Sequence, residues 1–171
     1  FFMARSLAPG LVTAADIIEY DLDAKPIDDT RQGYIERYIH SELYRARPDV
    51  KGVVHSHSPG MLPFGLTDTK LRAMTQSSWF LGDGAPVFDA MAHGAKLGFL
   101  INTADLGRAV AKEMGNGWVV LLRAHGNAVA GVSVREAVSI AVNTEESAKI
   151  QQNTLALGGN IRYLNAAEIK S

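Results

Sequence analysis

Two histidines separated by a single residue lie at the end of an apolar run, and side chains with this spacing could bind a metal ion. The run at 53–57 reads VVHSH and predicts a β-strand, in which residues two apart project from the same face. His55 and His57 would therefore point the same way. His125 follows a second apolar run, at 118–122. Three imidazoles at strand ends are typical of a catalytic divalent metal with open positions for substrate, although hydrogen-bonded or surface histidines would fit the same pattern.

A carboxylate upstream of the histidine strand could transfer protons beside such a metal. Apolar residues at every fourth position predict a helix over 33–47. Glu36 borders the apolar face of this helix, where partial burial would disfavour its charged form. We expect His40 to be a hydrogen-bonding neighbour of Glu36, and Glu42 to lie at the surface. From spacing alone, a solvated Glu36, or one paired with Arg37, fits better than a catalytic one.

Composition limits the kinds of partner and compartment. The chain has 171 residues, a net charge of −1 and no cysteine. Its length fits a single domain over 1–171 with a sizeable core, and its charge favours neither nucleic acid nor an anionic membrane. No apolar stretch approaches the ~18 residues of a membrane span. The lack of cysteine excludes disulfides and thiolate ligands and fits a cytoplasmic protein. Because the chain opens inside a strand-like run, we expect further residues upstream.

Strand-like and helical patterns alternate along the chain, which predicts an α/β layered domain with one central sheet. A Ser-x-x-Glu capping box opens a long helix that should reach about Leu157, before two glycines. The other elements are expected as strands near 1–4, 17–22, 50–57, 86–88 and 118–122, and as helices over 33–47 and 105–114.

The order of these motifs resembles the class II aldolase/adducin family over nearly the whole chain. The shared elements are Glu36 and His40, Arg-Pro-Asp at 47–49, His-x-His at 55–57 and His-Gly-Asn at 125–127. The resemblance implies a three-layer α/β/α domain with one central, largely antiparallel sheet. It also implies a C4 homotetramer with sites at subunit boundaries.

The resemblance further implies roles for individual residues. The positions of His55, His57 and His125 are those that bind Zn²⁺ or another divalent ion in this family. The glutamate 19 residues before the first histidine, which is Glu36 here, is an acid/base or a residue of the metal shell. This reverses the expectation for Glu36 drawn from spacing alone.

A departure from the family pattern bears on the reaction. Sugar-phosphate aldolases of the family carry two serines just before the glutamate, where they help to bind phosphate. Tyr34 and Ile35 stand there instead, and Ile35 offers no side-chain hydrogen bond. The segments 4–13, 63–65 and 80–88 resemble a subgroup of decarboxylases that act on hydroxylated pyridine and benzene dicarboxylates.

The leading hypothesis is a metal-dependent decarboxylase of a hydroxylated aromatic or pyridine carboxylate. The metal would be Mn²⁺ by preference and Zn²⁺ second, and Glu36 would protonate the metal-stabilised carbanion. An aldolase or dehydratase of a small sugar phosphate and a non-catalytic, adducin-like module remain as alternatives.

A small anionic substrate would need a positive charge to bind it. Arg5 and Ser6 follow the first strand, and a guanidinium binds a carboxylate through two parallel hydrogen bonds. Tyr163 could close over the site of a neighbouring subunit, although packing is its competing role. Arg123 could share the side of His125 or make a structural salt bridge.

Overall fold

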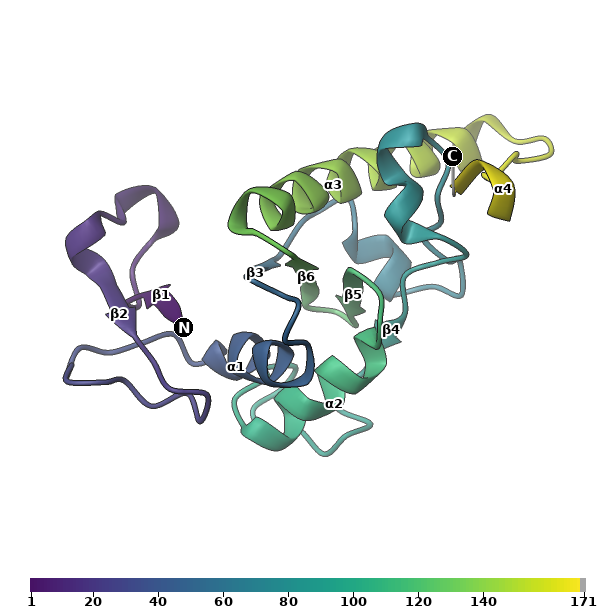
Figure 1. Cartoon of the computed structure of the whole chain (residues 1–171). Helices are drawn as coiled ribbons and strands as arrows, with labels where there is room; N and C mark the ends of the chain where they lie inside the picture. The colour runs from purple at the N-terminus through teal and green to yellow at the C-terminus, as the bar shows by residue number, and fades with distance from the viewer. Residues whose placement is uncertain (170–171) are drawn as a thin grey trace.

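A four-stranded sheet forms the centre of the computed structural model, which describes residues 1–169 (Figure 1). Its strands run in the order β3-β6-β5-β4. The sheet is antiparallel from β3 to β5, and only the edge pair β5–β4 is parallel. The strands are β3 (Gly52–Ser56), β6 (Gly126–Gly131), β5 (Val119–Leu122) and β4 (Val87–Phe88).

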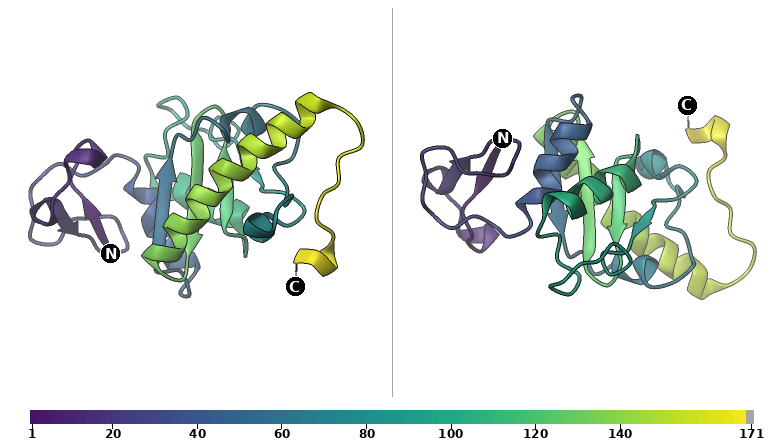
Figure 2. Two further views of the ribbon diagram at one scale, coloured as in Figure 1. Left: turned by 90° about the horizontal axis from the view of Figure 1, so that it is seen from above. Right: turned by 90° about the horizontal axis from the view of Figure 1, so that it is seen from below.

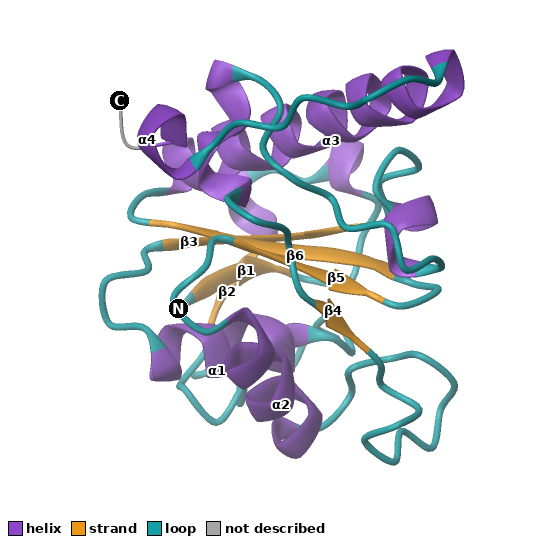
Figure 3. Cartoon of the chain, turned by 90° about the vertical axis from the view of Figure 1, so that its right-hand side faces the viewer, coloured by secondary structure: helices purple, strands orange, loops and turns teal. Residues whose placement is uncertain are grey.

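Helices cover both faces of this sheet (Figures 2 and 3). On one face lie α1 (Arg37–Ala46) and α2 (Ala104–Met114), and α3 (Val134–Leu157) crosses the other. A short helix, α4 (Ala166–Ile169), follows α3. The fold is therefore the expected three-layer α/β/α arrangement with a largely antiparallel sheet.

Strand alternation divides the core into two layers. Along β5, Val120 and Leu122 pack toward the cluster that contains Ile39 and Leu43 of α1. Their neighbours Val119 and Leu121 pack toward the α3 face. All four side chains are buried, as the two-residue period of a strand requires when both faces are covered.

A separate two-stranded hairpin lies beyond the N-terminal end of α1 (Figure 1). Its antiparallel strands are β1 (Phe2–Ala4) and β2 (Ile17–Glu19). The Tyr34 hydroxyl donates a hydrogen bond to the Leu7 carbonyl, which ties the hairpin to the segment before α1. Three short 3₁₀ helices and a longer, kinked one complete the structure, at Pro9–Leu11, Ala14–Asp16, Leu62–Gly65 and Gln76–Leu81.

The predicted helix over 33–47 was too long at its N-terminal end. Gly33 to Glu36 lie outside α1, and Ile35 is 46% exposed rather than buried with the helix face. The approach of Gly33 to Tyr20 explains part of this. A Cβ on Gly33 would lie 2.1 Å from the Tyr20 hydroxyl oxygen, so Gly33 packs against the residues next to the hairpin and α1 begins only after this contact.

Two further expectations were wrong. Glu42 is 2% exposed rather than on the surface, and it lies 3.5 Å from both Arg45 and Arg108. The strand β6 was not predicted, and the strand expected over 17–22 ends at Glu19. β6 consists mainly of glycine and alanine, because it is buried against helices on both sides and close approach leaves little room for large side chains.

Within residues 1–169, no helix is both long enough and apolar enough to span a membrane.

Candidate metal centre

Four polar side chains from distant parts of the chain meet at one end of the sheet. His55 belongs to β3, and His57 lies just beyond its last residue. His125 lies in the turn between β5 and β6, and Glu36 occupies the cap position before α1. One donor atom from each side chain lies within 4.8 Å of the other three. The four donors that the sequence predicted together are therefore brought together.

The imidazole of His55 is oriented by a backbone carbonyl. Its Nδ1 lies 2.9 Å from the Asn127 carbonyl oxygen and must donate the hydrogen bond. In neutral His55, Nε2 then carries a lone pair, and it lies 3.1 Å from Glu36 Oε2. Two acceptors at this distance require a proton or a cation between them. A hydrogen bond from one ring nitrogen to a backbone carbonyl is a usual way in which proteins orient a metal-binding histidine.

His125 presents buried ring nitrogens that lack hydrogen bonds. Its side chain is 7% exposed, and neither nitrogen has a hydrogen-bond partner among residues 1–169. Nε2 comes within 3.3 Å of Glu36 Oε2 but not in hydrogen-bond geometry. Buried polar atoms without partners are costly and uncommon in native proteins. A cation that Nε2 could bind would remove part of that cost.

His57 completes the group from the solvent side. Its ring centroid lies 5.1 Å from that of His55 and 4.7 Å from that of His125. Burial lowers the pKa of His57, and the neighbouring His55 and His125 lower it further. The neutral imidazole that this favours is the form that binds metals.

Glu36 divides its two oxygens between the backbone and the histidines. Oε1 accepts a 2.9 Å hydrogen bond from the Ile101 amide, and Oε2 faces His55 and His125. Burial raises the pKa of Glu36. The polar contacts with His125 and His55 and the Ile101 hydrogen bond outweigh this effect and hold the pKa well below its usual value.

The donor set fits a divalent cation. Three imidazoles and one carboxylate are ligands that Zn²⁺, Mn²⁺ and related ions accept. Positive charge at the centre of the group would relieve both the opposed acceptors on His55 and Glu36 and the orphaned Nε2 of His125.

The backbone around His125 is tightly constrained. Ala124 has φ of +55°, a left-handed conformation that residues with a Cβ rarely adopt. A Cβ on Gly126 would lie 2.2 Å from the Ser56 carbonyl oxygen. The β5–β6 turn and β3 therefore pack closely where each carries its histidine. The sequence motif at 125–127 includes Asn127, but it did not indicate the hydrogen bond of the Asn127 carbonyl, the contact of Ile101 or this packing.

His40 is near the group but does not bond to Glu36. Both Glu36 oxygens have other contacts, and the expected hydrogen bond between the two residues is absent. Burial and the neighbouring His55 lower the pKa of His40 to about 4. His40 therefore presents a neutral ring.

Two of the four donors, Glu36 and His55, line a cavity of about 350 Å³. Its walls are mainly apolar, and its polar side chains are those of Tyr34, Glu36, His40 and His55. The complete lining is Met3, Pro9, Tyr34, Ile35, Glu36, His40, Val53, Val54 and His55. This combination of an apolar cavity and a few converging polar groups is typical of a small-molecule site.

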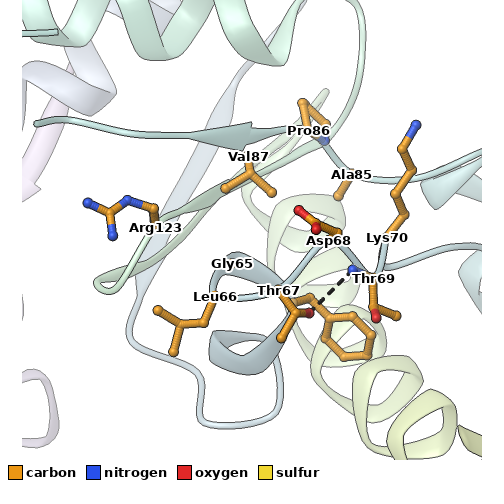
Figure 4. Close-up of a pocket in the computed structure, with 11 residues that line it drawn as sticks. Gly65, Leu66, Thr67, Asp68, Thr69, Lys70, Ala85, Pro86, Val87 and Arg123 are labelled. Atoms are coloured by element: carbon orange, nitrogen blue, oxygen red, sulfur yellow. Dashed lines mark hydrogen bonds between the residues drawn. The ribbon is translucent and has the colours of Figure 1, made fainter. Parts of the chain in front are cut away.

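A larger cavity, of about 490 Å³, lies between the segment 64–70 and β4 and contains none of the four donors (Figure 4). Arg123 is at one end of it, and its Nε donates a 2.7 Å bond to Asp89. Arg123 therefore makes the salt bridge that was one of its two expected roles.

The three predicted substrate-binding residues do not join the group. The Arg5 Nε bonds to Asp16 at 2.7 Å, and neither Arg5 nor the exposed Ser6 lines the 350 Å³ cavity, although both lie between its wall residues Met3 and Pro9 in sequence. The Arg72 guanidinium stacks on the ring of Tyr163, which also accepts a hydrogen bond from Gln151. Their substrate roles stay predictions.

Comparisons with known proteins agree with this picture of the fold. Residues 4–152 match the family model described as the class II aldolase and adducin N-terminal domain. A solved structure of an L-fuculose 1-phosphate aldolase superimposes with a TM-score of 0.83 at 22% identity, covering 99% of this chain and 77% of that one.

Several relatives are named as decarboxylases, and two of them show the extent of the match. The chain is 40% identical to decarboxylase tropJ of Talaromyces stipitatus, in an alignment that covers 92% of this chain and 64% of tropJ. It is 31% identical to a 3,4-dihydroxyphthalate decarboxylase of Arthrobacter keyseri, over 88% of this chain and 62% of that protein. The chain thus spans less than two thirds of the length of either relative. On the extent of the family match and the identity to tropJ, the chain belongs to the class II aldolase/adducin family.

Proposed function

We propose that this chain is a metal-dependent decarboxylase of a hydroxylated aromatic or pyridine carboxylate. The observation that carries the proposal is the group of Glu36 and three histidines, whose facing acceptor atoms a cation would satisfy, beside a mainly apolar cavity. The similarity to two proteins named as decarboxylases supports the choice of reaction.

The metal would be held by His55, His57 and His125, with Glu36 as a fourth contact. We favour Mn²⁺, with Zn²⁺ second, because imidazoles combined with oxygen ligands from the substrate suit both ions. A divalent cation bound here would act as a Lewis acid that stabilises negative charge as it develops on the substrate.

The apolar walls of the cavity suit a planar ring better than a phosphate. Met3, Val53 and Val54 offer no hydrogen bonds, and Ile35 stands where the sugar-phosphate aldolases of the family have a serine. The Tyr34 hydroxyl is already bonded to the Leu7 carbonyl, so it is not free for a ligand. A hydroxylated ring would bury its faces against these side chains and turn its polar substituents toward the histidines.

Glu36 would carry the proton that the reaction needs. When the carboxylate leaves as CO₂, the electrons of the broken C–C bond stay on the ring carbon, which must then gain a proton. Oε1 of Glu36 is fixed by the Ile101 amide, which leaves Oε2, beside His55 and His125, for proton transfer. A carboxylate that is ionised in the free protein can take a proton from the substrate hydroxyl and return it to the ring carbon.

The remaining parts of the proposal concern substrate charge, assembly and location. Arg5, Ser6 and Tyr163 are proposed to contact an anionic substrate, the last from a neighbouring subunit. A C4 homotetramer is proposed from the family resemblance, and exposed valines along one face of α3 support an assembly. A cytoplasmic location is proposed from the absence of cysteine.

A panel of substrates tests the reaction. Purified protein with Mn²⁺ would be given hydroxylated benzene and pyridine dicarboxylates, and CO₂ would be measured. We expect release from at least one ring acid, and none after chelation. Release that continues after chelation would contradict the metal dependence.

An aldolase of a small sugar phosphate is the second candidate. The fold shared with an L-fuculose 1-phosphate aldolase is compatible with this candidate, since the fold alone fits either reaction. The same preparation would be given L-fuculose 1-phosphate and assayed for aldehyde. If the protein releases aldehyde from the sugar phosphate but no CO₂ from the ring acids, the aldolase replaces the leading proposal. If the protein binds metal but forms neither product, an adducin-like module is favoured.

A further inference from the structure

Two of the three histidines lack a hydrogen bond to orient the ring, and only one of these two is exposed. His55 is oriented by the Asn127 carbonyl, and His125 is held by burial. His57 is exposed, and its ring makes no hydrogen bond within residues 1–169. The pairing of β3 with β6 ends at Ser56, so His57 also lies beyond the last paired residue. Besides its close approach to Gly126, the orientation of the His57 ring therefore depends on the backbone that follows it.

That backbone is held by α3 from the opposite face of the sheet. The Gly60 amide donates to both carboxylate oxygens of Glu145, at 3.1 and 3.0 Å. The Gly60 carbonyl accepts a hydrogen bond from the Gln152 side chain. The backbone amide and carbonyl of Gly60 are thus both hydrogen-bonded to α3, by side chains two helical turns apart.

The contact between Glu145 and Gly60 is close enough to exclude a side chain at position 60. A Cβ on Gly60 would lie 2.7 Å from Glu145 Oε2 and 2.9 Å from Oε1. Glu145 is 18% exposed, and Lys149 lies 3.3 Å from its Oε1. Hydrogen bonds from a backbone amide to a charged carboxylate are among the stronger ones in proteins. The Glu145 carboxylate therefore fixes the backbone at Gly60, which lies three residues after His57.

We propose that Glu145 is a positioning residue for the metal centre, and that it acts by fixing Gly60 and so the backbone of His57. The inference rests on the proposed metal site but not on the reaction or the substrate. It assigns a role in metal binding to a residue on the far side of the sheet from Glu36. Supporting residues of this kind change metal affinity by about 10–100-fold when they are removed.

Co²⁺ binding to the purified chain tests this proposal, because affinity and the visible absorption spectrum are read without turnover. We expect Glu145→Ala to weaken Co²⁺ binding by at least about 10-fold and to change the spectrum. Glu146→Ala is the matched control, since Glu146 is 62% exposed and contacts the same Lys149. Its affinity and spectrum should match those of the wild type. Glu145→Gln keeps an oxygen that accepts the Gly60 hydrogen bond, and it should recover most of the affinity.

Gly60→Ala provides a second test that leaves α3 unchanged if Glu145→Ala fails to fold. The new methyl group should displace the carboxylate and weaken Co²⁺ binding to a similar extent. In a Glu145→Ala background, where the methyl has room, it should add little further loss. Equal affinity and identical spectra for the Glu145 and Glu146 alanine variants would overturn the positioning role. A wild-type chain that binds no Co²⁺ would instead contradict the metal centre itself.

Discussion

Replacing Gly126 with alanine would put a methyl group between the two strands that carry the histidines. The new Cβ would lie 2.2 Å from the Ser56 carbonyl oxygen and 3.1 Å from both Cα and Cδ2 of His57. The first distance is about 1 Å shorter than an ordinary van der Waals contact. Because the obstructing atom belongs to the backbone, it cannot rotate away. β3 and β6 must therefore separate at the end of the sheet that holds the four donors.

The expected cost has two parts. Overpacking of this kind destabilises a fold by about 1–3 kcal/mol. A shift of ~1 Å also exceeds the ~0.5 Å within which a functional site must be held. We therefore expect Co²⁺ or Mn²⁺ affinity to fall by about 10–100-fold, the range seen when support for a metal ligand is lost.

Urea unfolding and metal competition with a chromophoric chelator would measure both effects. Gly10→Ala is the control, because a Cβ there meets nothing within 4 Å. It should leave both the free energy of unfolding and the metal affinity close to those of the wild type. A Gly126→Ala variant with wild-type affinity would refute the close packing of β3 and β6 as the support of the site.

Three other outcomes follow from the structure. His55→Ala should abolish bound metal, measured by elemental analysis after dialysis; an unchanged metal content would remove His55 from the ligand set. Glu36→Gln should retain the metal and lose CO₂ release, and full activity would exclude its role in proton transfer. Leu43→Ala should lower the free energy of unfolding by about 2–5 kcal/mol in chemical denaturation, because the side chain is fully buried in the core. Leu157→Ala, at an 87% exposed position, should change it by less than about 0.5 kcal/mol, and similar losses for both variants would contradict the assigned core.

The metal donors could be predicted because strand periodicity is a local property. His55 and His57 share a face through their spacing alone, and the turn with His125 follows a run of four buried apolar residues. The family resemblance then supplied Glu36, which spacing alone had not favoured. The three-layer fold followed from the same alternation of apolar runs and helical patterns.

Other features depend on tertiary contacts that no local pattern carries. β6 was missed because burial on both faces selects glycine and alanine, which have low strand propensity. The start of α1 was misplaced because Gly33 and Tyr34 bond and pack with the hairpin rather than with the helix. Glu145 is separated from Gly60 by 85 residues, so its contact is visible only in the folded chain.

The dependence of CO₂ release on metal tests the central claim most directly. Protein stripped of metal would be titrated with Mn²⁺ in the presence of a hydroxylated aromatic dicarboxylate that the wild type decarboxylates. We predict no release from the stripped protein, a rise in rate with added metal, and saturation at one ion per chain, as expected for the one group of four donors found within residues 1–169. Undiminished release from metal-free protein would contradict the account.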